Sequence, residues 1–223
     1  MKMLKTRART TAEALEFLKH GNDRFTRGRR SMKSFFMQTH PAQSQDGGGL
    51  SPFAIILACM DPRVPVEILF DQGVGDVVVV RGAGGIATPH VIASLEFAVA
   101  TFHPPLCVVM GHTDCRAVKA VISAAVDPSP RSGESFVEAF LPFVRGAIET
   151  MTGRPTQEKI SNSGMEGPWM EEAAWVFVHD GCRRLSEESS LIRKAVDQEE
   201  ITIVGAMYDV NTGRATFAPE KKG

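Results

Sequence analysis

Three side chains that carry metal-donor atoms lie next to apolar segments of the chain. Cys59 directly follows the apolar run 53–58, and His112 and Cys115 follow the run 106–110. Apolar runs without alternation are typical of strands that are buried on both faces of a parallel sheet. Because ligands bind at the carboxyl ends of such strands, two neighbouring strands would bring these side chains together around one ion. Two thiolates and one imidazole are a donor set that catalytic zinc sites use.

The fourth position around such an ion is predicted to be open or filled by a carboxylate. A structural zinc site would need a fourth Cys or His, and neither Cys107 nor Cys182 is proposed as that ligand. Those two cysteines are interpreted as small buried apolar side chains. Asp61 follows Cys59 by two residues, so it projects to the same side of an extended strand end and can supply the carboxylate. Arg63 can form an ion pair with it.

Strand and helix patterns alternate along most of the chain, and this order indicates a parallel sheet. Strands are predicted from the apolar runs 53–58, 77–80, 106–110 and 201–206. Helical spacing or capping residues predict helices over residues 10–28, 89–102, 117–126, 135–151, 171–185 and 191–196. A polar turn before residues 216–217 predicts a hairpin-like return. Irregular structure is predicted where no period is sustained, in residues 29–49, 127–133 and 153–168.

A glycine-rich segment competes with the metal hypothesis. Residues 82–87 follow a predicted strand and fit the G-x-G-x-x-A fingerprint of dinucleotide-binding turns. That fingerprint is followed about 20 residues later by an acidic residue, where this chain has Phe102 and His103. The segment also follows the second predicted strand and not the first. The glycines are therefore interpreted as positions that allow close backbone approach.

The composition of the 223 residues is that of an ordinary globular protein with one hydrophobic core. The net charge of -1 gives no general attraction to nucleic acids or anionic membranes, so neither is a predicted partner. The first 33 residues carry ten basic and three acidic side chains, an excess interpreted as a solvated surface. No apolar run approaches the roughly 18 residues of a membrane span. With four scattered cysteines, a cytoplasmic protein is predicted.

Two motifs of the chain resemble the signatures of beta-class carbonic anhydrases. Residues 59–63 match C-x-D-x-R, and residues 112–115 match H-x-x-C. The likeness extends over most of the chain and includes the segments ALEFLKHGNDRF, PFAIILAC, SLEFAV and IVGAMYDVNTGR. It implies an α/β fold with a central parallel sheet of strand order 2-1-3-4 and a C-terminal antiparallel strand, with helices on both faces.

The resemblance also implies how the chain is organised. Residues 1–50 would form an N-terminal helix and an extended arm that belong to the same domain and pack on a partner subunit. Residues 51–223 would form the zinc-binding domain. A homodimer would be the minimal unit, and homotetramers and larger assemblies occur in the family.

By the same resemblance Cys59, His112 and Cys115 would bind Zn²⁺, and Asp61 with Arg63 would form a catalytic dyad. In the open state of the family the arginine holds the carboxylate away from the metal, whereas in the closed state the carboxylate is the fourth zinc ligand. The sequence leaves both states open. The implied reaction is the reversible hydration of carbon dioxide to bicarbonate and a proton by zinc-bound hydroxide.

Two further functions are kept as alternatives. The motifs also resemble branches of the family that hydrolyse carbonyl sulfide or carbon disulfide, which are linear apolar molecules like carbon dioxide. The other alternative is a zinc-stabilised assembly protein without catalysis. It is suggested by Pro62 and Arg116, which stand where the family commonly has serine and glycine. A third departure is Gly82, at a position where the family usually has asparagine.

Overall fold

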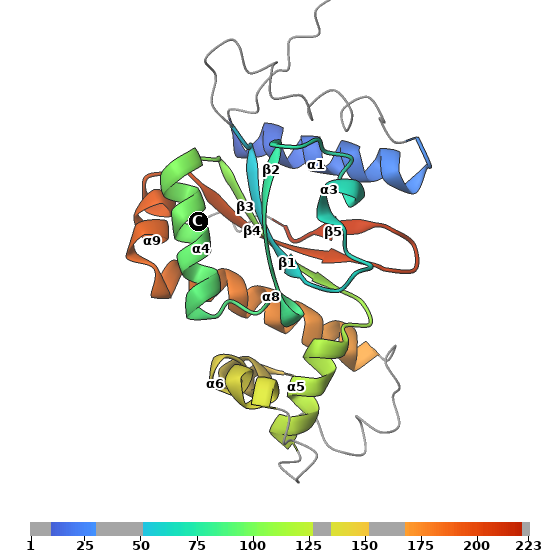
Figure 1. Ribbon diagram of the computed structural model, residues 1–223, viewed down its shortest axis with the longest axis vertical. Helices are drawn as coiled ribbons and strands as arrows, with labels where there is room; N and C mark the ends of the chain where they lie inside the picture. Colours follow the sequence, from blue (N-terminus) through green and yellow to red (C-terminus); the bar gives the residue numbers. More distant parts are fainter. Residues whose placement is uncertain (1–9, 30–50, 127–134, 152–167, 220–223) are drawn as a thin grey trace, which may run out of the picture.

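A single five-stranded sheet forms the centre of the computed structural model, which describes residues 10–29, 51–126, 135–151 and 168–219 (Figure 1). The strand order is β2-β1-β3-β4-β5, and every neighbouring pair is parallel except β4 and β5. The strands are β1 (Ala54–Cys59), β2 (Val77–Gly82), β3 (Leu106–His112), β4 (Thr202–Tyr208) and β5 (Ala215–Phe217). The predicted strand order and the antiparallel final strand are therefore confirmed.

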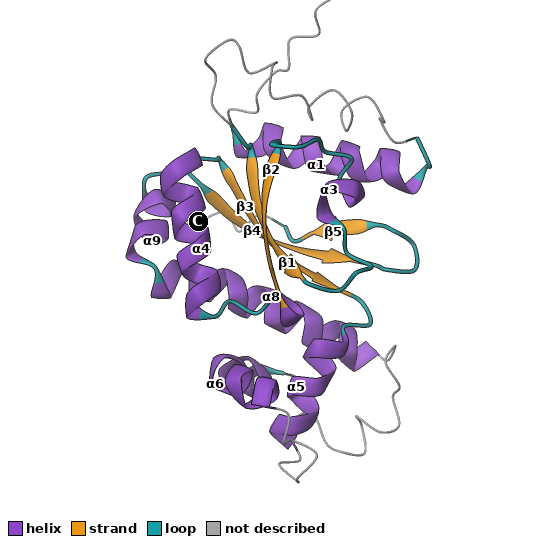
Figure 2. Cartoon of the chain, viewed as in Figure 1, coloured by secondary structure: helices purple, strands orange, loops and turns teal. Residues whose placement is uncertain are grey.

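Helices cover both faces of this sheet, as Figure 2 shows. They are α1 (Thr11–Thr26), α3 (Val66–Leu69), α4 (Pro89–Phe102), α5 (Arg116–Val126), α6 (Ser135–Thr150), α8 (Pro168–Glu188) and α9 (Ser190–Asp197), with a 3-10 turn η2 (Ala83–Gly85). Each helix expected from the sequence is present. The short helix α3 was not predicted, because four residues are too few to show a helical period.

Helix α1 packs on one face of the sheet in its own chain. Its first turn is fixed by a capping box, in which Thr10 accepts from the backbone N–H of Glu13 and the Glu13 carboxylate accepts from the backbone N–H of Thr10. Leu15 and Leu18 are buried with alternate strand residues such as Ile56 and Val108. The predicted contact of this helix with a partner subunit remains a prediction.

The opposite face of the sheet is covered by α4, α8 and α9, which lie together in Figure 1. Strand residues of the other parity, such as Ile55, Leu57 and Val109, pack against Leu95 of α4 and Val178 of α8. Because successive side chains of a strand point to opposite faces, the continuous apolar runs supply both cores at once. This explains why the runs lack polar alternation.

A third apolar cluster, formed by α5, α6 and the first half of α8, lies beyond the carboxyl ends of β1 and β3. It includes Cys59 and Cys115 together with Ile122, Val144 and Phe177. The ends of the two strands are therefore enclosed by helices, which keeps water away from the two sulfur atoms.

The irregular segments expected at 29–49, 127–133 and 153–168 lie outside the described residues, except for Arg29 and Pro168. Among the helices that the structure describes, none is both long and apolar enough to cross a membrane.

Candidate metal centre

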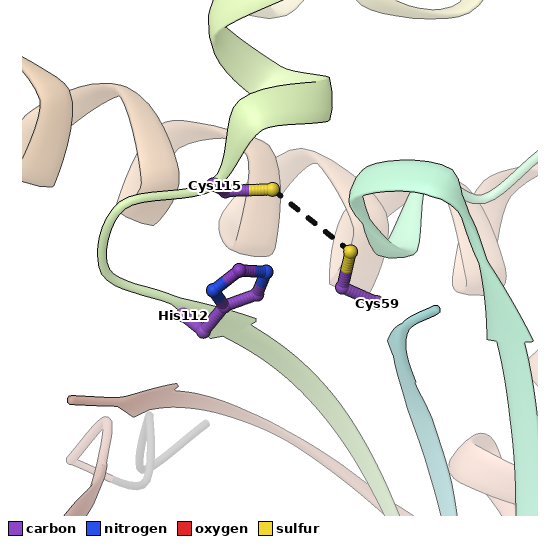
Figure 3. Close-up of side chains that lie close together, drawn as sticks. All are labelled: Cys59, His112 and Cys115. Carbon is purple, nitrogen blue, oxygen red and sulfur yellow. Dashed lines mark hydrogen bonds between the residues drawn. The ribbon is translucent and has the colours of Figure 1, made fainter. Parts of the chain in front are cut away.

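Cys59, His112 and Cys115 meet at the carboxyl edge of the sheet (Figure 3). Cys59 is the last residue of β1 and His112 the last residue of β3, and these two strands are parallel neighbours. Cys115 directly precedes α5. The three donor atoms lie within 4.8 Å of one another, and all three residues are buried. The structure thus brings together the three residues that the sequence singled out.

The imidazole of His112 is oriented for metal binding. Its Nδ1 lies 2.8 Å from the backbone carbonyl oxygen of Thr113. A carbonyl oxygen only accepts hydrogen bonds, so Nδ1 carries the proton and the lone pair is on Nε2. Within the described residues, Nε2 is buried and has no hydrogen-bond partner. A buried nitrogen without a partner costs free energy unless something binds it, and here a metal ion would do so.

The distance between the two sulfur atoms and the ionisation of their thiols both agree with a role as metal ligands. Their separation is 4.0 Å, close to the roughly 3.8 Å expected for two thiolates on one tetrahedral zinc ion. The hydrogen bond between them lowers the pKa of the Cys59 thiol and, together with burial, raises the pKa of Cys115. Without a cation the pair therefore keeps one proton between the two sulfurs, and ionisation of both would need a divalent metal beside them.

Asp61 lies beside this donor set and is held by Arg63. The Nε and Nη2 atoms of Arg63 lie 3.0 and 2.8 Å from the two carboxylate oxygens of Asp61, and the backbone N–H of Arg63 donates to the same group at 2.9 Å. These hydrogen bonds lower the pKa of Asp61 to about 2. The carboxylate is thus ionised at neutral pH and directed toward the guanidinium.

Arg81 fixes the backbone that connects Cys59 to Asp61. Its Nε donates to the carbonyl oxygen of Cys59 at 3.1 Å, and its Nη2 donates to the carbonyl oxygen of Asp61 at 2.7 Å. Arg81 belongs to the neighbouring strand β2. The side chain therefore ties the end of β1 to the edge of the sheet.

The glycine-rich segment 82–87 supports the same strand ends. Gly84 and Gly85 have φ values of 66° and 64°, a left-handed conformation that glycine adopts without strain. A Cβ atom on Gly85 would lie 3.5 Å from the backbone of Ala58, Cys59 and Met110. The segment thus approaches β1 and β3 closely, in agreement with the structural interpretation of the glycines.

Asp114 is a site residue that the sequence did not indicate. Its carboxylate oxygen lies 2.6 Å from Nη1 of Arg63, and its backbone carbonyl oxygen accepts from Nη2 at 3.0 Å. Asp114 and Arg63 are 51 residues apart. The H-x-x-C motif marks position 114 only as variable, so no local signal could reveal this contact.

The three departures from the family pattern leave the donor atoms in place. Pro62 and Arg116 are exposed. Within the described residues, a Cβ atom on Gly82 would meet only Val91, at 3.7 Å, which is an ordinary van der Waals contact. These residues change the surroundings of the site and not the positions of its ligands.

The fold and the three buried donors define an α/β protein with a candidate metal site at the carboxyl edge of its sheet. The family model for carbonic anhydrase matches residues 54–215. Carbonic anhydrase 2 of Mycobacterium tuberculosis is 35% identical over 209 residues, covering 92% of this chain and 91% of that protein. The carbonic anhydrase of Mycolicibacterium smegmatis is 34% identical and covers 90% of each chain. The chain therefore belongs to the beta-class carbonic anhydrase family.

The fold agrees with this assignment. A tetrameric beta-carbonic anhydrase from the filamentous ascomycete Sordaria macrospora superimposes with a TM-score of 0.64. The similarity covers 82% of this chain and 88% of that one, at 21% sequence identity. At that level of identity the likeness concerns the fold alone.

Proposed function

We propose that this protein catalyses the reversible hydration of carbon dioxide to bicarbonate and a proton at a zinc ion held by Cys59, His112 and Cys115. The observation that carries the proposal is the buried donor set, whose three atoms lie within 4.8 Å of one another in a chain of the carbonic anhydrase family. The unpartnered Nε2 of His112 adds to its support.

Zinc would supply the acidified water of the reaction, since it lowers the pKa of bound water to about 7 in the histidine-ligated carbonic anhydrases. In this chain the donors would be two sulfurs and one nitrogen. Thiolates donate more charge than imidazoles, so the metal would acidify water less. A hydrogen-bond acceptor beside the metal is then more important, and Asp61 is in place to act as one.

Asp61 and Arg63 would form the catalytic dyad. The carboxylate oxygens of Asp61 are acceptors, and Arg63 directs them by two side-chain hydrogen bonds. Bound to Arg63, the carboxylate is not available as a fourth metal ligand. This contact supports an open site. In such a site Asp61 would accept a hydrogen bond from a reacting group and orient that group.

The apolar faces of the surrounding helices would keep water out of the site. Apolar residues of α5, α6 and α8 surround Cys59 and Cys115. A water-excluding wall strengthens the electrostatic interactions inside the site. It also suits a small apolar substrate such as carbon dioxide.

Stopped-flow measurement of carbon dioxide hydration, on protein whose zinc content is determined in the same preparation, tests the proposal. One zinc per chain with rapid hydration supports it. One zinc per chain without hydration at any pH between mildly acidic and mildly alkaline overturns it. Hydrogen sulfide release from carbonyl sulfide or carbon disulfide by that preparation would then support the hydrolase alternative, and its absence the assembly protein.

We also infer that the protein self-associates. Among the described residues, five large apolar side chains are exposed: Met60, Ile68, Val74, Phe97 and Leu191. Strand β2 is an edge strand of the sheet. Sheet edges and exposed apolar side chains are both features through which proteins associate. Light scattering coupled to size exclusion should give a dimer or a larger assembly, and a monomer at all concentrations would contradict the inference.

The cytoplasm remains the proposed location. No disulfide bond joins any of the four cysteines, all of which lie within the described residues. Disulfide bonds are common in oxidising compartments and rare in the cytosol, so cysteines without disulfide bonds are compatible with this location. Cell fractionation followed by detection of the protein would test it.

A further inference from the structure

Arg63 is held from two sides by two different loops. Asp61, in the loop between β1 and α3, binds Nε and Nη2 of the guanidinium. Asp114, in the loop between β3 and α5, binds Nη1 at 2.6 Å through its carboxylate and Nη2 at 3.0 Å through its backbone carbonyl. The planar guanidinium has its donors in a rigid fork, so contacts on both sides determine its orientation.

The backbone at position 114 is adapted to this contact. Asp114 has a φ of 56°, in the left-handed region, where aspartate and asparagine are more frequent than other side chains with a Cβ atom. Its side chain is 21% exposed, while that of Arg63 is 39% exposed. A partly exposed ion pair adds little to stability. Its main effect is then on where the guanidinium points.

We propose that Asp114 is a positioning residue that orients Arg63 toward Asp61 and thereby keeps the Asp61 carboxylate away from the metal position. This inference rests on the proposed function only in requiring a metal at Cys59, His112 and Cys115. It goes beyond the dyad, because Asp114 is a third residue, 51 positions from Arg63 in the sequence. Asp114 controls how firmly Arg63 stays paired with Asp61.

The consequence of losing the Asp114 side chain follows from the hydrogen bonds that remain. Nη1 of Arg63 loses its carboxylate partner, and only the contact of Nη2 with the backbone carbonyl of residue 114 is retained. The guanidinium then rotates more freely, and its two-point contact with Asp61 is weakened. The released carboxylate would then be able to compete with external ligands for a metal held by Cys59, His112 and Cys115.

Two substitutions separate this positioning effect from the effect of charge. Asp114→Asn and Asp114→Gly both remove the negative charge, and both residue types tolerate a positive φ. Only asparagine keeps a side-chain oxygen that can accept from Nη1. A difference between the two variants therefore reports the lost anchor and not the lost charge.

The measurement is a thiocyanate titration of the Co²⁺-substituted protein, followed by visible absorption. We expect Asp114→Gly to bind thiocyanate about threefold more weakly than Asp114→Asn, a factor within the range that an exposed polar pair contributes. The sulfur-to-cobalt charge-transfer band in the absence of thiocyanate should be the same in both, since the ligands are unchanged. Asp180→Asn is a matched control, because Asp180 pairs with Arg183 on the surface of α8, and it should titrate like wild type.

Equal thiocyanate affinity in the two Asp114 variants, or tighter binding by Asp114→Gly, would overturn the proposal. A second measurement needs no metal: exchange of the Arg63 Nε–H proton with water, followed by NMR in the metal-free protein. It should be faster in Asp114→Gly than in Asp114→Asn, and equal rates also overturn the proposal. If wild type binds no Co²⁺ or hydrates no carbon dioxide, the proposed function fails, while the exchange rates still decide the role of Asp114.

Discussion

The Sγ atoms of Cys59 and Cys115 lie 4.0 Å apart, although 56 residues separate them in the sequence. One sulfur comes from the end of strand β1 and the other from the residue that precedes helix α5. Parallel pairing of β1 with β3 brings the two segments together, and the helices beyond the sheet bury both sulfurs.

Replacing one of these sulfurs should remove the metal. We expect Cys115→Ala to purify with far less than one zinc per chain, because two donors hold a divalent ion much less firmly than three. Elemental analysis of the purified protein measures this. Cys182→Ala is the control and should retain zinc, since Cys182 lies in the apolar cluster of α8 away from the three donors. Stoichiometric zinc in Cys115→Ala would show that the proposed ligand set is wrong.

Asp61→Asn should separate metal binding from turnover. The amide retains the shape of the side chain but has no negative charge. It therefore attracts Arg63 less strongly than the carboxylate does, and it is a weaker proton acceptor. We expect full zinc content and a loss in kcat of about 100-fold, the lower end for a group that handles a proton. Asp23→Asn, at an exposed ion pair on α1, should leave both quantities unchanged. Hydration within a few-fold of wild type in Asp61→Asn would contradict the role assigned to the dyad.

Replacement of two helical glycines by alanine should change the stability of the protein in opposite directions. A Cβ atom on Gly21 of α1 would lie 1.7 Å from the backbone carbonyl oxygen of Phe70. We expect Gly21→Ala to lower the free energy of unfolding by roughly 1–3 kcal/mol, because either helix α1 or the turn at Phe70 must shift to make room for the methyl group. Apart from the backbone of its own helix, no atom of the described residues lies within 4 Å of the corresponding position on Gly146 of α6. Gly146→Ala should raise stability by about 0.5–1 kcal/mol. Urea unfolding of both variants measures these changes, and a stable Gly21→Ala would argue against the close packing of α1 on the turn at Phe70.

The turn between β4 and β5 should make stability depend on pH through Asp209. Hydrogen bonds from the Thr212 hydroxyl and the Asn211 backbone N–H lower the pKa of this carboxyl group. A lowered pKa in the folded state means that the carboxylate stabilises the fold above its ordinary pKa of about 4. This contribution is lost as the pH falls through the lowered value.

Asp209→Asn is the variant that tests this dependence. We expect it to be less stable than wild type at neutral pH, and the difference should shrink as the pH is lowered below about 4. Unfolding by urea at a series of pH values, on metal-free samples of both proteins, measures the difference. A difference that is independent of pH would show that the Asp209 charge does not contribute.

Local pattern was sufficient to predict most elements of the fold. The apolar runs at 53–58 and 106–110 became β1 and β3 with shifts of one or two residues at their ends. The alternation of strands and helices predicted a parallel sheet, because helical crossovers are the usual way to connect parallel strands. Helix α3 was missed, since a single turn has no period to detect.

By itself, the sequence determined the donor types and the elements that carry them. Cys59, His112 and Cys115 were identified because their spacing after two apolar runs is a local property of the chain. Asp61 and Arg63 follow Cys59 closely, and the family motif adds their role as a dyad. Local spacing is sufficient to predict this donor set, because neighbouring parallel strands end at the same edge of the sheet.

Only the tertiary structure decided the contacts between segments that are distant in sequence. Asn22 of α1 donates to the carbonyl oxygens of Leu69 and Gly213 and accepts from the backbone N–H of Ala215, so one buried amide joins three segments. Asp114 meets Arg63 in the same way, across 51 residues. Such contacts depend on strand register and on how the loops are packed, and neither leaves a periodic or local signal in the sequence.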